Sequence, residues 1–97
     1  MATLNETIHQ PVRLRIMAAL VTLEPGSEVD FTYLRDLLEV TDGNLGAHLR
    51  KLEDAGYISV NKVFVERKPH TYASATPEGR RVFQEHVTAL ESILKSK

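Results

Sequence analysis

The sequence has 97 residues and contains no cysteine. This absence excludes a disulfide framework and any metal site built from thiolates, and it is compatible with a reducing compartment. No apolar run approaches the ~20 residues that a membrane helix needs. The first seven residues lack the basic and apolar regions of a secretory signal. We therefore expect a cytoplasmic protein with no membrane partner.

Catalytic motifs are missing as well. The sequence contains no glycine-rich phosphate loop, no paired-carboxylate signature and no His-x-x-x-His pair, and its four histidines fall in different predicted elements. His86 could join Glu85 or another subunit in a metal site, but a single histidine on a helical stripe is more often part of the core. We predict that the chain is not an enzyme and needs no cofactor or metal.

An excess of basic charge is also missing, because 12 Lys and Arg residues are balanced by 13 Asp and Glu residues. A formal net charge of −1 argues at first against a nucleic-acid partner. The charges are unevenly spread, however: residues 1–43 contain three basic and seven acidic side chains, whereas residues 44–97 contain nine basic and six acidic ones. The second half of the chain therefore carries the positive excess that a phosphate-binding surface needs.

Length and hydrophobic spacing describe one domain, residues 1–97, with three helices in its first half. Apolar residues recur at helical spacing over residues 11–23, 31–39 and 42–55. Good N-cap residues precede the second and third of these helices, and Gly56 follows the third. The second and third helices are separated by so few residues that they must form a helix-turn-helix corner.

After Gly56 the pattern changes to that of β-strands. Residues 57–65 and 71–73 are β-type and flank a polar turn at 66–69, which predicts a two-stranded hairpin. A proline in the first helical position then begins a helix over residues 77–95. The predicted fold is α+β and mostly α: a winged helix-turn-helix with a three-helix core, a two-stranded β-hairpin wing and a C-terminal dimerisation helix.

Four segments of the chain carry a combined signature. They are residues 11–16 (PVRLRI), 41–58 (TDGNLGAHLRKLEDAGYI), 68–72 (KPHTY) and 76–80 (TPEGR). In this order and at these spacings they resemble the first helix, the recognition segment, the wing and the start of the final helix of small winged-helix transcriptional regulators of the MarR/ArsR-like group. The resemblance implies a DNA-binding regulator that acts as a dimer.

Two glycines weaken the predicted recognition helix, residues 42–55, because glycine inside a helix costs roughly 1 kcal/mol relative to alanine. Gly43 lies in the first turn, where glycine is tolerated. Gly46 has two open interpretations: the helix tolerates it without a functional role, or it allows a close approach of the backbone to DNA. The MarR/ArsR-like group often has serine and a basic residue where this sequence has Gly46 and Ala47, so this helix has fewer side chains that could bind phosphate.

The candidate DNA contacts lie on the outer face of residues 42–55, at the start of the preceding helix, and in the wing at about residues 62–70. Asn44 and Arg50 are the best candidates for reading bases, and Arg67 and Lys68 for binding phosphate. The full set is Thr32, Tyr33, Asn44, Ala47, His48, Arg50, Lys51, Arg67, Lys68 and His70. The alternative interpretations are a solvated helix face and a solubilising turn.

The last helix carries an apolar seam with heptad-like spacing, and two apolar residues precede the first helix without an obvious core to enter. We predict that residues 1–9 and 77–95 form a homodimer interface. Its candidate residues are Leu4, Ile8, Phe83, Val87, Leu90, Ile93 and Leu94. The alternative is a monomer in which the last helix folds entirely onto the first.

The sequence therefore predicts a sequence-specific regulator that binds double-stranded DNA as a homodimer, with residues 42–55 in the major groove and the wing on the backbone or minor groove. The alternative function is a winged-helix module that binds protein and not DNA, because a fold alone does not fix function. The sequence identifies no small-molecule effector, target site or sign of regulation.

Overall fold

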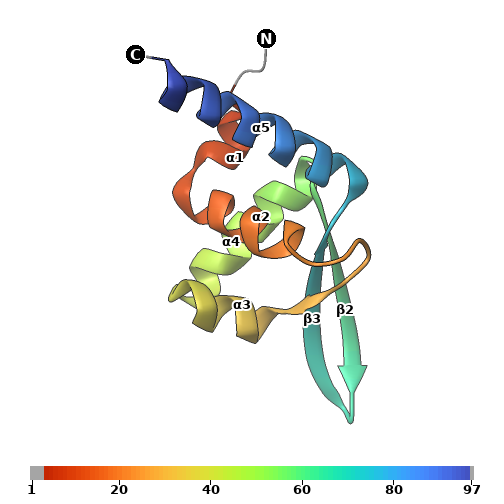
Figure 1. The fold of residues 1–97 in the computed structure, drawn as a ribbon. Helices are drawn as coiled ribbons and strands as arrows, with labels where there is room; N and C mark the ends of the chain where they lie inside the picture. The colour runs from red at the N-terminus through yellow and green to blue at the C-terminus, as the bar shows by residue number, and fades with distance from the viewer. Residues whose placement is uncertain (1–3, 97) are drawn as a thin grey trace.

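The computed structural model describes residues 4–96, which form five helices and three strands (Figure 1). In order, the elements are α1 (Glu6–His9), α2 (Pro11–Val21), β1 (Val29–Asp30), α3 (Phe31–Leu38), α4 (Asp42–Asp54), β2 (Ile58–Val65), β3 (Lys68–Ala75) and α5 (Pro77–Lys95). Helices α2, α3 and α4 lie beside the β2–β3 hairpin, whose tip extends beyond them, and α5 lies across the opposite end. The predicted winged helix-turn-helix is confirmed.

Side-chain caps explain where the long helices begin. The Asp30 carboxylate accepts hydrogen bonds from the backbone of Thr32 and Tyr33 at the start of α3. The Thr41 and Thr76 hydroxyls accept from backbone N–H groups in the first turns of α4 and α5. These bonds satisfy donors that a helix terminus otherwise leaves without partners, which is why the predicted starts of these helices match the structure.

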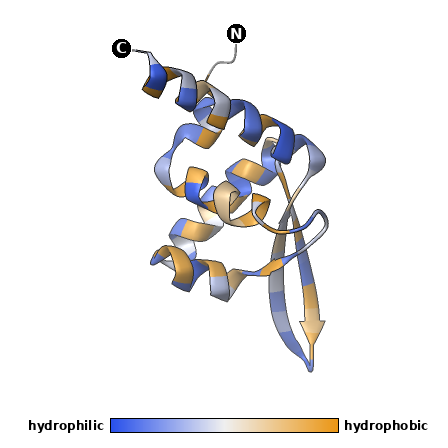
Figure 2. Ribbon diagram, viewed as in Figure 1, coloured by the Kyte–Doolittle hydropathy of each residue, from blue (hydrophilic) through white to orange (hydrophobic). Residues whose placement is uncertain are grey.

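The core is an apolar cluster between the helices and the base of the hairpin. Figure 2 shows apolar segments on helices α2, α3 and α4. Its completely or almost completely buried side chains include Ile16, Met17 and Leu20 of α2, Leu34 and Leu38 of α3, and Leu45, Leu49 and Leu52 of α4. The i, i+4, i+7 spacing of the α4 leucines fixes the rotation of that helix about its axis. Its polar residues therefore face outward.

The sheet has three antiparallel strands in the order β1-β3-β2, one strand more than the sequence predicts. Strand β1 pairs with Tyr72 and Ala73 of β3. It is only two residues long, so the sequence shows no alternating pattern there that could predict it. The predicted four-residue turn is also wrong in length. Glu66 and Arg67 alone form it, with φ of 51° and 68°, and Val65 pairs with Lys68. Two left-handed residues match the type I′ turn of a two-residue hairpin.

The N-terminal segment corrects another expectation. Ile8, expected at a dimer surface, is completely buried in the core of the single chain. It lies in α1, a one-turn helix capped by the Asn5 side chain, which accepts the backbone N–H of Ile8. Four helical residues are too few for a periodic pattern, so no local signal indicates that this segment packs inward.

A backbone junction joins α4, the hairpin and α5. The N–H of Gly56, at φ 84°, donates to the Glu53 carbonyl, and that of Tyr57 donates to the Leu52 carbonyl. This is the Schellman arrangement that ends many helices. The Thr76 hydroxyl donates to the Gly56 carbonyl at 2.7 Å, and the Thr76 N–H donates to the Tyr57 carbonyl at 3.0 Å. The start of α5 is thus held against the end of α4.

The buried His86 side chain connects α5 to α1. The backbone N–H of Asn5 donates to His86 Nδ1 at 3.0 Å, and His86 Nε2 lies 3.4 Å from Nδ1 of His9. Because Nδ1 accepts a hydrogen bond, the neutral His86 ring carries its proton on Nε2 and can donate it to His9. A second proton on Nδ1 would oppose the Asn5 N–H. Burial, and secondarily the charge of His9, accordingly lowers the pKa of His86.

We predict that the free energy of unfolding falls as the pH drops below about 6.5, the usual histidine pKa. His86 has a lowered pKa in the folded chain, so the unfolded chain binds more protons in this range and is favoured there. Urea unfolding at a series of pH values measures the slope. His86→Leu should flatten it, leaving the contribution of half-buried His48, whose pKa is also lowered, first by burial and then by Arg13. An equal slope in His86→Leu would contradict this role.

Two helical glycines have opposite surroundings, which leads to a second prediction. A Cβ on Gly79 would overlap the backbone carbonyl oxygen of Tyr57, whereas a Cβ on Gly46 would meet nothing within 4 Å. Gly79→Ala should lower the free energy of unfolding by about 1–3 kcal/mol, since backbone must move. Gly46→Ala should raise it by up to about 1 kcal/mol through helix propensity. Thermal unfolding checks both predictions. Equal changes of stability in the two variants would refute the close approach of Gly79 to the Tyr57 backbone.

Candidate nucleic-acid interface

Helices α3 and α4 form a helix-turn-helix corner of three residues. Helix α3 ends at Glu39, a non-glycine residue in the left-handed region at φ 55°. The Arg35 guanidinium spans the corner: its Nη1 lies 2.9 Å from an Asp42 carboxylate oxygen and its Nε 3.1 Å from one of Asp36. Exposed ion pairs contribute little stability. Their consequence here is that one guanidinium offsets one of the two negative charges of Asp36 and Asp42.

The outer face of α4 presents the residues that the sequence predicts there. The exposed ones are Asn44, Ala47, Arg50 and Lys51, and His48 is half-buried. Arg50 and Lys51 lie on different flanks of the helix. Arg50 faces the hairpin, whereas Lys51 lines a separate hollow with Glu6, Thr7 and Arg13 on the side of α1 and α2.

At the start of α3, the predicted DNA contacts Thr32 and Tyr33 have only their side chains available for a ligand. The backbone N–H groups of Thr32 and Tyr33 already donate to the Asp30 carboxylate, so they are not free for a phosphate. The helix N-terminus is occupied by an anion from its own chain. Both side chains are exposed, Tyr33 by 61%, so their hydroxyls are the groups that could still contact a ligand.

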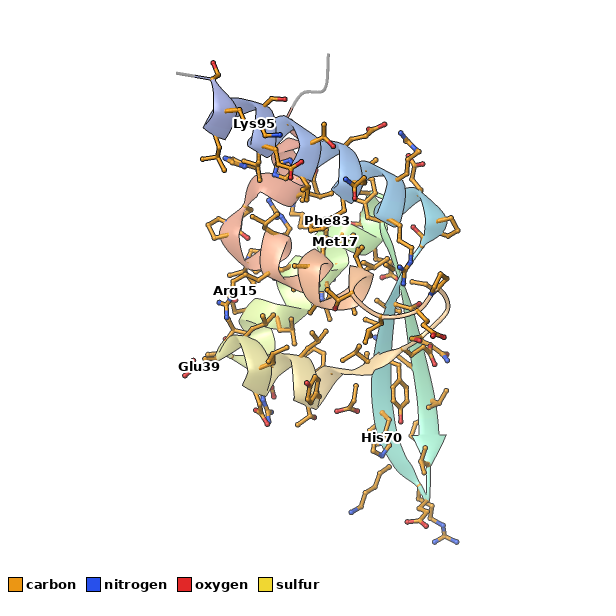
Figure 3. All side chains as sticks on the ribbon, in the orientation of Figure 1. Arg15, Met17, Glu39, His70, Phe83 and Lys95 are labelled. Atoms are coloured by element: carbon orange, nitrogen blue, oxygen red, sulfur yellow. The ribbon has the colours of Figure 1, made fainter. Side chains whose placement is uncertain are left out.

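The wing places its basic residues at the far end of the hairpin. Arg67 and Lys68 are exposed, whereas His70 is half-buried and stacks on Tyr72. His70 Nδ1 lies 3.9 Å from an Asp30 carboxylate oxygen, so this side chain lies beside the start of α3. Figure 3 shows His70 on the hairpin and Lys95 at opposite ends of the molecule, whose long axis measures 55 Å.

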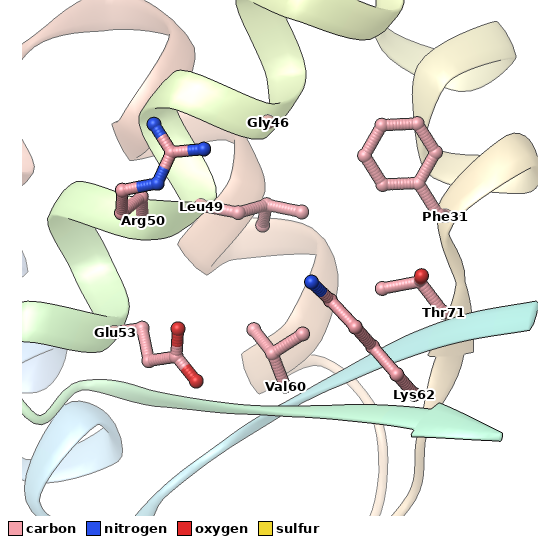
Figure 4. Close-up of a pocket in the computed structure, with 8 residues that line it drawn as sticks. All are labelled: Phe31, Gly46, Leu49, Arg50, Glu53, Val60, Lys62 and Thr71. Carbon is pink, nitrogen blue, oxygen red and sulfur yellow. The ribbon is translucent and has the colours of Figure 1, made fainter.

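A cavity of about 240 Å³ separates α4 from the hairpin (Figure 4). One stripe of α4, at positions i, i+3, i+4 and i+7, faces strands β2 and β3 across it. The lining residues are Phe31, Gly46, Leu49, Arg50, Glu53, Val60, Lys62 and Thr71. The missing side chain of Gly46 leaves one wall open. Arg50 and Lys62 supply positive charge from the two sides, Glu53 of α4 supplies one negative charge, and the Lys62 amine points toward α4.

Lys62 is not among the DNA contacts that the sequence predicts. Strand alternation could have found it, because Lys62 lies two residues from Val60, which packs against the core, and so shares the face of the hairpin that points toward α4. The sequence alone does not say how far the helices cover that face.

The predicted dimer residues fall into three groups. Ile8 is buried within the chain, as described above. Leu4, Phe83, Val87 and Leu90 are half-buried, and Ile93 and Leu94 are 55% and 76% exposed. The last turns of α5 project past the helical core (Figure 1). The most exposed apolar surface of α5 therefore lies at its C-terminal end.

Other kinds of site find no support within residues 4–96. No group of three or more His, Asp or Glu side chains there is arranged to hold a metal ion. None of the helices described combines the length and the apolar character that crossing a membrane requires.

Comparison with known proteins identifies a family. A model of the winged helix DNA-binding domain matches residues 12–94. An uncharacterized protein of Methanocaldococcus jannaschii is 34% identical over 85 residues, 88% of this chain and 89% of that protein. A transcriptional regulator homologue from Pyrococcus horikoshii OT3 has a TM-score of 0.84 and 28% identity, over 94% of this chain and 87% of that one.

A protein of Enterococcus faecalis V583 described as a MarR-family transcriptional regulator has a TM-score of 0.71 and 25% identity, over 93% of this chain and 74% of that one. These matches agree with the resemblance in the sequence and with the helix-turn-helix, hairpin and final helix of the structure. The chain belongs to the family of winged helix DNA-binding domains.

Proposed function

We propose that this protein is a transcriptional regulator that binds a specific double-stranded DNA site as a homodimer. The observation that carries the proposal is the position of the basic hairpin beside the outer face of α4, with a cavity between them that has Arg50 on one side and Lys62 on the other. A helix of this size fits the major groove, and a two-stranded hairpin can reach the neighbouring groove.

In this arrangement, the cavity would accommodate one sugar–phosphate strand of the duplex. The major and minor grooves of a duplex are separated by one sugar–phosphate strand. A protein with α4 in the major groove and its hairpin in the adjacent minor groove must straddle that strand. The strand would lie along the cavity, where the Arg50 and Lys62 cations can bind phosphate and the bare backbone at Gly46 allows close approach.

Base reading falls to residues nearer the start of α4. In a helix-turn-helix the first residues of the recognition helix contact base edges. Asn44 is exposed there, and its amide can pair with the N6 and N7 atoms of adenine. Arg50 follows almost two turns later, where it can reach a guanine edge or the phosphate strand. Arg67 and Lys68 at the hairpin tip contribute mainly phosphate affinity.

The homodimer is formed through α5. Leu94 and Ile93 expose apolar surface at its end, and the half-buried Leu90, Val87 and Phe83 continue the seam toward the core. Leu4, also half-buried, precedes Asn5, whose backbone N–H donates to His86 of α5. A two-fold axis through this seam would place two recognition helices on one side of the dimer. A palindromic site requires them roughly 34 Å apart, one turn of the duplex.

The first functional prediction separates base reading from phosphate binding. Asn44→Ala should cost about 1–3 kcal/mol at one base pair and relax the preference there. Arg67→Ala with Lys68→Ala should weaken binding to all duplexes alike, and the salt slope should fall by about 0.9 for each phosphate that the variant no longer binds. Selection from a random duplex pool at two salt concentrations measures both effects.

Two outcomes would count against these roles. A double wing variant with the parent's affinity and salt slope would remove the wing from the interface. A parent protein that binds no duplex at all, even at low salt, would favour the module that binds protein.

The second functional prediction concerns the dimer. Leu94→Glu places a charge on a side chain that is 76% exposed in the single chain, so it should leave the fold intact and disrupt an apolar seam. Sedimentation should shift from dimer to monomer, and affinity for a palindromic site should fall. Ser92→Glu, at an exposed position two residues away, is the matched control and should remain dimeric. An unchanged Leu94→Glu profile would exclude this seam.

A further inference from the structure

The wing tip carries an exposed aromatic side chain that the fold does not use. Phe64 is 78% exposed, more than any other large hydrophobic residue in the described part of the chain. It pairs across the hairpin with Pro69, which is also exposed. Only the pair Val65 and Lys68 separates them from the turn. Figure 2 shows this apolar end of β2 at the tip of the hairpin.

The register of the hairpin fixes which face Phe64 occupies. Alternation along β2 places it with Lys62, Val60 and the buried Ile58, on the face that points toward α4 and the cavity. Val65, 46% exposed, lies on the opposite face. The core-facing side of the hairpin therefore continues past the helices and ends in an apolar group with no cover from its own chain in the part that the structure describes.

The surroundings of Phe64 indicate what could cover it. Between residues 59 and 72 the hairpin carries three basic side chains, Lys62, Arg67 and Lys68, and one acidic side chain, Glu66. An apolar tip inside a basic collar is complementary to a polyanion with an apolar interior. A duplex groove has this character, because phosphates line its edges and sugars and base edges form its floor.

The backbone conformation of the turn also supports a duplex groove as the partner of Phe64. Glu66 and Arg67 both adopt left-handed conformations, which non-glycine residues rarely do. Asparagine and glycine would relieve the strain at these positions, yet the chain has a long cationic side chain at the second one. Strained backbone of this kind clusters at sites of function. Here it presents Arg67 at the tip of a ribbon only two strands wide.

We infer that Phe64, backed by Pro69, is an apolar wedge that enters the minor groove and bends the duplex, while Arg67 and Lys68 bind the flanking phosphates. Phenylalanine and proline are among the side chains that proteins insert between base steps from the minor groove. The wedge would favour sites with a flexible pyrimidine–purine step under each wing, which adds sequence preference without hydrogen bonds to bases. This inference rests on the proposed DNA binding.

The test compares Phe64→Ala with Val65→Ala, neighbouring apolar truncations on opposite faces of the same strand. The probe is a duplex selected by the parent protein from a random pool, labelled at its two ends so that energy transfer reports the bend. Phe64→Ala should bind about 10- to 100-fold more weakly, as expected from the loss of one buried aromatic side chain, and should bend the duplex less. Val65→Ala should bind within about twofold of the parent with the same bend. Phe64→Leu should restore most of the bend.

Each other outcome overturns the wedge in a recognisable way. Phe64→Ala with the parent's affinity and bend would remove Phe64 from the interface while leaving DNA binding established. Equal losses in both truncations would indicate a structural effect, which circular dichroism and thermal unfolding would detect. A change of oligomeric state in Phe64→Ala without DNA would assign the tip to contacts between copies of the chain. A parent protein that neither binds nor bends any duplex would refute the proposed function itself.

Discussion

The junction at Gly56 and Tyr57 is the contact on which the rest of the arrangement depends. Gly56 ends α4 in a left-handed turn, and the two carbonyls of the junction accept hydrogen bonds from Thr76, the cap of α5. The Tyr57 hydroxyl accepts a bond from the Asn5 side chain, which also caps α1. The recognition helix, the wing, α5 and the N-terminal segment therefore meet within a few residues. A bulky change at Gly79 disturbs all of them because its backbone lies against the Tyr57 carbonyl.

The charge of the molecule follows from this layout more than from its composition. A net charge of −1 is a poor guide because seven of the 13 acidic residues lie in residues 1–43, whereas α4 from Asn44 onward and the hairpin lie in residues 44–97, which carry nine basic and six acidic side chains. Arg35 offsets one of the two negative charges of Asp36 and Asp42, and Asp30 caps α3. The cavity and the hairpin tip carry four basic side chains, Arg50, Lys62, Arg67 and Lys68, against two acidic ones, Glu53 and Glu66. In the proposed complex, a modest positive region of this kind would give weak nonspecific affinity and leave discrimination to a few placed contacts and to the geometry of the proposed dimer.

Elements with a long pattern and a cap can be predicted from the sequence, and elements held by distant partners cannot. The four longer helices are predicted to within two residues because their apolar spacing and N-caps are local signals. The two-residue strand β1 exists only because β3 pairs with it, and α1 is one turn long. The candidate interface divides in the same way. Its helical residues follow from periodicity, whereas the role of Lys62 depends on where the helices stop covering the hairpin, which is a tertiary property.

Two local costs to stability lie on the surface proposed to meet DNA, and this coincidence is informative. Gly46 sacrifices helix propensity although the structure leaves room for a side chain, so packing inside the protein does not require it. Glu66 and Arg67 hold a turn that other residues would form with less strain. Neither feature improves the folded chain. A bare backbone in the cavity and a cation at a narrow tip both improve contact with a phosphate strand, and functional sites are where proteins are expected to break one or two local rules of stability.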